Sequence, residues 1–136
     1  MNILSNRLHY LAFTGSLNVN ADAIKVALMT SAYVPDKDTN TFDNTDEITG
    51  TGYTTGGKDL TGSVMTQEDA LDLAKWDADD ISWSGSTLTA RYAVAYNTTR
   101  ANAILFVIDF GTDKISSEGL FVLKWNSAGI LNQAQA

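Results

Sequence analysis

Acidic and amide side chains between residues 36 and 47 come closest to the composition of a metal site. Oxygen donors fall at the first, third, fifth and twelfth positions of a calcium-binding EF-hand loop, occupied here by Asp36, Asp38, Asn40 and Glu47. Two features argue against a true EF-hand, because Thr41 stands where that loop needs a glycine and Pro35 interrupts any preceding helix. We therefore expect a solvated acidic loop without a metal, and a calcium site of another type is the alternative.

A second segment, residues 52–59, nearly matches the phosphate-binding P-loop, which ends in Gly-Lys-Ser/Thr. Asp59 replaces the hydroxyl that holds magnesium in such loops, and its negative charge would repel phosphate. Residues 60–64 alternate like a strand, so no helix N-terminus would face the anion. The pattern favours a glycine turn that leads into a strand and argues against nucleotide binding.

Side chains for acid–base or nucleophilic catalysis are few. His9 is the only histidine and the chain has no cysteine, so histidine triads, thiolate chemistry and cysteine-based metal sites lack their residues. A second acidic cluster comes just before Ile81, where aspartates commonly cap turns, and comprises Asp72, Asp77, Asp79 and Asp80. We predict no catalytic residue and no cofactor, and a hydrolase that uses the acidic clusters is the least supported alternative.

The charge of the chain argues against two classes of partner. Sixteen acidic and nine basic residues give a net charge of −7, whereas nucleic acids and anionic membrane surfaces attract basic proteins. No apolar run approaches the ~20 residues of a membrane-spanning helix, and the first residues lack the pattern of a signal peptide. We expect a protein that is made in the cytoplasm and binds neither nucleic acid nor membrane.

The first residues have the periodicity of a helix. Leu4, Leu8 and Leu11 follow helical spacing and predict a helix over residues 3–14. Gly15 is placed to end this helix, because glycine readily adopts the left-handed conformation found after helix C-termini. Beyond Gly15 the helical spacing disappears.

The rest of the chain has the patterns of strands. Alternating or continuous apolar residues, separated by turn residues, predict strands at 23–30, 60–64, 71–75, 81–83, 88–96, 103–110 and 120–125. Residues 132–136 form a polar tail that we expect to fray. Together these patterns indicate one all-β domain over residues 1–136, an antiparallel β-sandwich or small barrel of about seven to eight strands with one short N-terminal helix.

Residues 33–57 form a long polar loop, and loops of this length are usually functional or disordered. Tyr33, Phe42 and Tyr53 lie in or beside it, and a loop aromatic has no core to join unless the loop folds back or docks on a partner. We predict that this loop arm and the helix contact other subunits. The candidate interface residues are Leu4, Leu8, Tyr10, Leu11, Tyr33, Phe42 and Tyr53.

Several short motifs, taken in order, resemble a family of small capsid decoration (cement) proteins of tailed bacteriophages. They lie at residues 24–28 (IKVAL), 33–36 (YVPD), 50–62 (GTGYTTGGKDLTG), 77–83 (DADDISW), 88–96 (LTARYAVAY), 108–111 (IDFG), 123–125 (LKW) and 129–131 (GIL). The resemblance spans residues 3–131 and implies a jelly-roll-like sandwich on the outside of the virion. It implies binding to the major capsid protein, self-association as a dimer or trimer, and assembly in the bacterial host cytoplasm, and it carries no catalytic residue.

Other function classes remain open from the sequence. Small β-domains also occur in phage tails, head fibres and baseplates, so a structural component of one of these is the main alternative to a cement protein. The acidic loop and the β-sandwich also permit a carbohydrate- or calcium-binding module.

Overall fold

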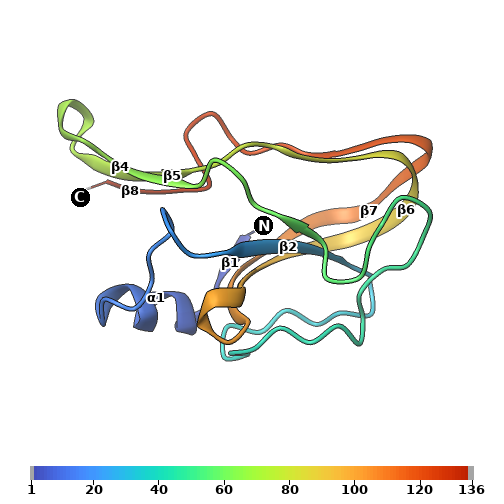
Figure 1. Ribbon diagram of the computed structural model, residues 1–136, viewed down its shortest axis with the longest axis horizontal. Coiled ribbons are helices and arrows are strands. Elements are labelled where there is room, and N and C mark those ends of the chain that lie inside the picture. The colour runs from blue at the N-terminus through green and yellow to red at the C-terminus, as the bar shows by residue number, and fades with distance from the viewer. Residues whose placement is uncertain (1, 135–136) are drawn as a thin grey trace.

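The computed structural model describes residues 2–134, which form two antiparallel β-sheets and one α-helix (Figure 1). The elements are β1 (Asn2–Leu4), α1 (Asn6–Phe13), β2 (Ile24–Met29), β3 (Lys58–Asp59), β4 (Val64–Glu68), the 3-10 turn η1 (Asp69–Leu71), β5 (Leu73–Asp77), β6 (Ile81–Asn97), the 3-10 turn η2 (Thr98–Arg100), β7 (Ala103–Leu123) and β8 (Leu131–Ala134). One sheet has the strand order β1-β7-β6-β2-β3 and the other β4-β5-β8. The predicted all-β sandwich with one short N-terminal helix is confirmed.

β6 and β7 form a hairpin long enough to contribute to both layers of the sandwich. β6 has 17 residues and β7 has 21. In Figure 1 they run together through the lower layer, bend over at one end and return along the upper layer. The register shifts between Ala90 and Tyr92, opposite Gly111 with its φ of 81°. The strands predicted at 81–83 and 88–96 are thus one strand, and those at 103–110 and 120–125 are also one, which ends at Leu123.

The main core lies between the two layers and follows the alternation of strands that bury one face. β2 directs Ile24, Val26 and Leu28 into it, and none of the three is more than 2% exposed. From the upper layer, the rings of Trp83 and Phe121 meet edge to face with centroids 5.9 Å apart. Apolar burial on this face therefore holds the bent hairpin closed over the lower sheet.

The first part of the long loop, which carries Tyr33 and Phe42, covers the opposite face of the five-stranded sheet, whereas Ile48 and Tyr53 farther along the loop pack on the main core. Ala27 and Met29 of β2 point to this face and are fully buried. Tyr33 and Phe42 from the loop pack against them. Isolated bridges tie the loop to the strands at Met29–Glu47, Thr41–Ala103 and Thr51–Thr87. The loop thus forms an irregular third layer below the sheet in Figure 1.

The helix begins at Asn6 rather than at residue 3, so the predicted start was wrong. Residues 2–4 form β1, which pairs with β7. Ser5 ends this strand and caps the helix, because its Oγ accepts a hydrogen bond from the Leu8 N–H at 2.9 Å. Leu4 lies before the Ser5 cap but keeps the helical spacing of Leu8 and Leu11. The spacing therefore does not show that the helix starts after Ser5. The predicted stop is confirmed, since Gly15 has a φ of 75° just after the helix.

The predicted polar tail was also wrong for residues 132–134. These residues belong to β8, which pairs antiparallel with β5 and places Leu131 opposite Trp76. The Ile130 N–H donates to the Trp76 carbonyl at 2.7 Å and begins this pairing. Residues 132–134 therefore form a strand because the edge of β5 is available for pairing. Their own sequence has no strand pattern. Residues 135 and 136 lie outside the described residues.

A buried serine supports the irregular part of the β6–β7 hairpin. Ser86 is fully buried, and the strand register shifts on both sides of it, toward Trp83 and toward Leu88. Its Oγ lies 3.0 Å from the Trp83 carbonyl, 3.1 Å from the Gly119 carbonyl and 2.9 Å from the Ser116 Oγ. These contacts stand in for ladder hydrogen bonds that the bulges remove.

We expect Ser86→Ala to lower the free energy of unfolding by about 1–3 kcal/mol, because buried acceptors would lose their partner. Urea denaturation followed by tryptophan fluorescence measures this loss. Ser84→Ala, at an exposed position of the same strand, is the matched control and should change stability by less than about 0.5 kcal/mol. Equal losses in the two variants would contradict the role assigned to Ser86.

Candidate functional site

The four oxygen donors of the acidic loop do not converge on one point. Asp36 accepts the N–H of Asp38 at 2.9 Å, and Asp38 accepts the side-chain amide of Asn6 at 2.5 Å. Asn40 uses its carbonyl in a hydrogen bond to β7, and the Glu47 carboxylate faces other partners. Among residues 2–134, no three His, Cys, Asp or Glu side chains are grouped so that they could hold a metal ion. The loop carboxylates instead form hydrogen bonds with other groups of the same chain.

Glu47 anchors the loop to β2. Its carboxylate accepts hydrogen bonds from the Tyr53 hydroxyl and from the Gly56 N–H, the latter at 2.7 Å. The Tyr53 oxygen in turn accepts the N–H of Leu28 at 3.0 Å. Burial, together with the hydrogen bond to Glu47, raises the pKa of Tyr53 far above its usual value. The phenol therefore stays protonated throughout the physiological pH range, and its O–H donates a hydrogen bond to Glu47.

We expect Tyr53→Phe to lower the free energy of unfolding by about 1–3 kcal/mol at pH 7, because the Leu28 N–H and the Glu47 carboxylate would each lose a partner. Urea denaturation measures it, with Tyr10→Phe at an exposed ring as the control. The raised pKa means that this contribution is complete below the ordinary tyrosine pKa of ~10 and declines as the pH rises above it. A Tyr53→Phe variant as stable as the control would contradict the assignment.

The other two loop aromatics also find partners within the chain. Tyr33 packs edge to face with Tyr92, with centroids 5.7 Å apart, and Phe42 stacks on Tyr96 at 4.1 Å. Burial, with a smaller contribution from Asp36, raises the pKa of Tyr33. The sequence indicated that each loop aromatic needs a packing partner. The loop folds back onto the sheet, and residues of β6 provide these partners. A role for these rings in contacts with other subunits stays a prediction.

The glycine-rich segment forms a close turn against the sheet. A Cβ on Gly57, which has a φ of 82°, would lie 1.9 Å from the Val26 carbonyl oxygen. The Lys58 Nζ donates to the Ser82 carbonyl at 2.6 Å and lies 5.8 Å from the centre of the Trp83 ring. The lysine that would contact phosphate in a P-loop is thus engaged with β6. The predicted glycine turn is confirmed, but the strand predicted at 60–64 was wrong, because strand pairing covers Lys58–Asp59 and resumes only at Val64.

Of the aspartates just before β6, Asp77 makes a local contact of the kind that its sequence position predicts, whereas Asp79 and Asp80 bind distant segments. Asp77 accepts the N–H of the next residue at 2.9 Å. Asp79 accepts the Thr61 hydroxyl at 3.1 Å, and Asp80 accepts the Trp125 N–H at 2.9 Å. Each carboxylate meets a different segment, and the three do not form a shared acid–base pair.

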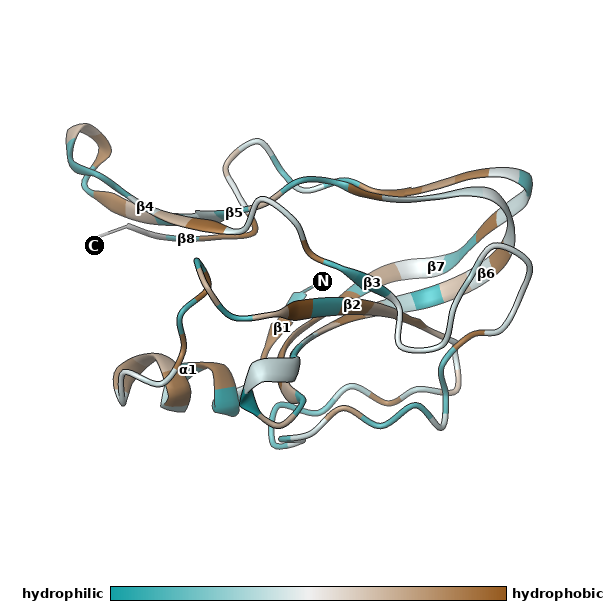
Figure 2. Ribbon diagram, viewed as in Figure 1, coloured by the Kyte–Doolittle hydropathy of each residue, from teal (hydrophilic) through white to brown (hydrophobic). Residues whose placement is uncertain are grey.

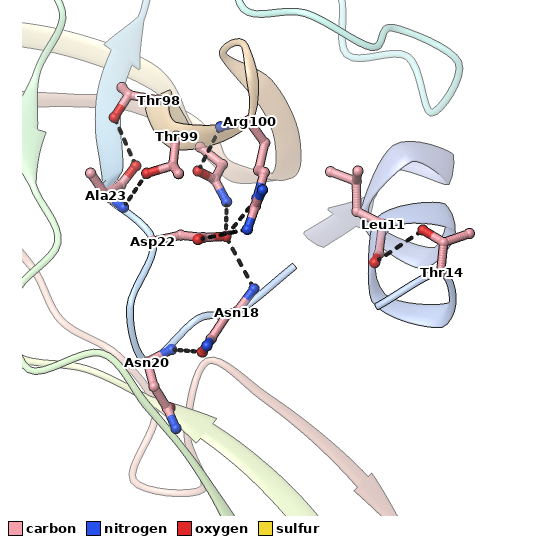
Figure 3. Close-up of polar contacts among 10 residues, drawn as sticks. Leu11, Thr14, Asn18, Asn20, Asp22, Ala23, Thr98, Thr99 and Arg100 are labelled. Atoms are coloured by element: carbon pink, nitrogen blue, oxygen red, sulfur yellow. Dashed lines mark hydrogen bonds and ion pairs between the residues drawn. The ribbon is translucent and has the colours of Figure 1, made fainter. Parts of the chain in front are cut away.

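The most connected polar cluster joins the start of β2 to the turn between β6 and β7. Figure 3 shows Asp22 between Asn18 and Arg100. The Asp22 carboxylate, 4% exposed, accepts the Asn18 N–H at 3.0 Å and the Asn97 amide at 2.8 Å, and pairs with Arg100 at 3.4 Å. Burial raises the pKa of Asp22, but the hydrogen bonds from Asn18, Asn97 and Arg100 outweigh it and leave the pKa below its usual value. The cluster is a clamp between two chain segments.

The helix α1 divides its apolar residues between core and solvent. Residues packed inward are Leu4 of the adjoining β1, Leu8 and Leu11. Tyr10 and Phe13 point outward, 59% and 84% exposed, and the Arg7 guanidinium lies 5.2 Å from the centre of the Tyr10 ring. We call Arg7, Tyr10 and Phe13 the outer face of α1. His9, also exposed, contacts the Ser5 carbonyl through Nδ1 at 3.1 Å.

The upper arm of β7 has an unpaired edge. β1 pairs with β7 no farther than Ile108, and from Gly111 to Leu123 the only strand paired with β7 in the described part of the chain is β6. Leu120 and Val122 on this arm are 62% and 47% exposed. Brown segments, which mark hydrophobic residues, are visible along the upper layer in Figure 2. Unpaired edges that carry apolar side chains are places where another chain can add.

Two shallow pockets meet at this edge. One, of about 450 Å³, lies against Ile115, Leu120 and Val122. The other, of about 290 Å³, opens between the layers beside β1. Both are lined by Phe110, Leu123 and Lys124, and no carboxylate of the described residues lines either one. The two pockets at the β7 edge are therefore lined largely by apolar residues, and Lys124 borders both of them.

Sequence reasoning missed Phe13, Leu120 and Val122 as candidate interface residues. The run Leu-Phe-Val-Leu at 120–123 matches a strand buried on both faces, so the exposed pair cannot be told from the buried pair by pattern. A signal was present in the helix, where Phe13 widens the apolar stripe beyond what one buried face can hold.

Within residues 2–134, no helix has the length and apolar character needed to cross a membrane. No protein-family model, curated protein or solved structure matches the chain.

Proposed function

We propose that this chain is a structural virion protein that binds the outside of a phage capsid, stabilises contacts between major capsid subunits and associates with itself. The observation that carries a binding role is the distribution of side chains. The polar groups that could do chemistry hold loops in place, while large apolar groups are exposed on the surface, including those on the outer face of α1 and at the edge of β7. The resemblance of residues 3–131 to cement proteins supports the virion setting.

The two surfaces lie on different layers of the sandwich. α1 lies at the lower left of Figure 1, with Leu8 in the main core, and the upper arm of β7 runs along the upper layer. A protein with separate apolar surfaces can contact two neighbours at once, which is what a clamp between capsid subunits requires. We assign the outer face of α1 to the capsid, because its aromatic pair and Arg7 have the composition of an interface anchor.

Deletion of residues 1–14 is a poor test of this proposal, since it would remove β1 together with the core residues Leu8 and Leu11. The double variant Tyr10→Ser, Phe13→Ser changes the exposed surface alone. Co-sedimentation with expanded capsids of the phage that encodes the chain should show at least a ~10-fold loss of affinity, because aromatic anchors often contribute 1–3 kcal/mol each. The control is Leu71→Ser, which alters an exposed apolar residue on the β4–β5 hairpin.

Wild-type capsid affinity in the double variant would contradict the assignment of α1. Mass spectrometry of separated heads and tails tests the alternative of a tail, head-fibre or baseplate component. Recovery of the chain with heads supports the cement role, and recovery with tails alone favours the alternative.

A further inference from the structure

We propose that two copies of this chain pair their β7 strands antiparallel, with the two-fold axis at Phe121, so that their upper layers join into one sheet. This inference deepens the self-association included in the proposed function and does not depend on a capsid. It rests on three features of the upper arm of β7: its unpaired edge, the stretch from Gly119 to Leu123, and the side chains that would face each other in a two-fold pair.

The edge has one regular stretch. Gly111 and Glu118 on β7 have positive φ values of 81° and 47°, and each coincides with a register shift against β6. Such bulges interrupt pairing with a new strand. From Gly119 to Leu123 no β7 residue has a positive φ, and the register shift against this stretch comes from one extra residue of β6 between Trp83 and Ser86. A partner strand can therefore pair along the outer edge of β7 here.

The regular stretch is self-complementary in its apolar side chains. Leu120 and Val122 face solvent, whereas Phe121 and Leu123 are 7% and 6% exposed and face the core. An antiparallel two-fold at Phe121 places Leu120 of each copy directly opposite Val122 of the other. Cross-strand apolar pairs at such positions stabilise sheets, and this register forms the pair twice.

The same register matches charges. Glu118 and Lys124 lie three residues to either side of Phe121, so each lysine comes opposite a glutamate of the other copy. Two-fold axes at the neighbouring exposed residues do not give these apolar and charged pairs. An axis at Leu120 places Val122 opposite Glu118, and an axis at Val122 places Leu120 opposite Lys124. A charged residue opposite an exposed apolar residue forms neither an ion pair nor an apolar contact.

A second copy fits this edge better than a generic acidic or basic partner. Carboxylates and lysines alternate along it, at Asp113, Lys114, Glu118 and Lys124, so that a partner of one sign would meet repulsion as well as attraction. A strand with the opposite order of charges matches Glu118 and Lys124 at the two ends of the stretch 119–123, and β7 itself, read antiparallel, supplies that order.

Sedimentation velocity of the wild-type chain should show a concentration-dependent dimer. Glu118→Lys and Lys124→Glu should each raise the dimer dissociation constant about tenfold or more, and the double charge swap should bring it back toward the wild-type value. Leu120→Lys should give a monomer, with Leu71→Lys as the matched control. Thermal unfolding of each variant checks that the fold is kept. A wild-type monomer at every concentration, or single reversals that dimerise as well as the wild type, would overturn the pairing.

The absence of cysteine from the chain allows a direct test of register. Under mild oxidation, a mixture of Leu120→Cys and Val122→Cys proteins should form a disulfide between the two variants, because these positions face each other across the pair. Either variant alone should cross-link several-fold less. Self-linking of one variant that equals the mixture would overturn the register. A chain that stays monomeric yet binds capsids would overturn this inference and leave the proposed function standing.

Discussion

Gly57→Ala should be among the most destabilising single substitutions in this chain, with an expected loss of at least about 3 kcal/mol. An added Cβ would lie 1.9 Å from the Val26 carbonyl oxygen and 2.7 Å from the Ala27 Cα. Both neighbours belong to the backbone of β2, which is paired with β6 and β3 and cannot move aside cheaply. The positive φ of 82° adds the ordinary cost of a left-handed residue.

Gly15→Ala is the matched control for this prediction. Gly15 has a similar φ of 75°, but nothing lies within 4 Å of the position of its Cβ. Gly15→Ala should therefore lower the free energy of unfolding only by the cost of a left-handed backbone conformation, about 1 kcal/mol. Urea denaturation of both variants separates the close approach from the backbone angle. Equal losses would show that the loop does not rest on β2 as described.

Asp22→Ala should lower the free energy of unfolding by about 3 kcal/mol at pH 7, because it leaves buried donors without an acceptor. Asn97, which is fully buried, would lose the carboxylate that its amide contacts at 2.8 Å. Asp59→Ala is the control, since Asp59 is 74% exposed and pairs with Lys25 at 3.7 Å. Exposed pairs of this kind contribute less than about 1 kcal/mol.

The stability that Asp22 contributes should depend on pH in a defined direction. Its pKa is lowered by the fold, so the unfolded chain takes up a proton at a higher pH than the folded chain does. The contribution is therefore complete above about pH 5 and is lost as the pH falls through the ordinary aspartate pKa of ~3.9 and below. The difference in unfolding free energy between wild type and Asp22→Ala should shrink over this range. A difference that stays constant from pH 6 to pH 3 would contradict the clamp.

Local patterns predicted the parts of this fold that depend on local spacing. The alternation of Ile24, Val26 and Leu28 located β2 almost to the residue, since one face of that strand is packed on the core. The gaps predicted between strands 81–83 and 88–96 and between strands 103–110 and 120–125 were wrong, because Gly85 and Gly111 in these gaps lie within bent strands. A strand that bends from one layer to the other cannot be distinguished locally from two strands.

The candidate surfaces depended on distant contacts and were only partly predictable. The sequence showed that Tyr33, Phe42 and Tyr53 need partners but not that β2 and β6 supply them. The exposure of Leu120 and Val122 depends on how far β1 runs along β7, which no pattern within residues 120–123 records. Burial of a strand edge is set by its neighbours in the sheet.

The most direct test of the proposed function is cryo-electron microscopy of expanded phage capsids of the kind to which the proposal assigns this chain, with and without the purified protein. Added density on the outer surface is expected where major capsid subunits meet, with the sandwich oriented so that the outer face of α1 contacts the capsid. Saturating protein that leaves the capsid surface bare would contradict the proposal.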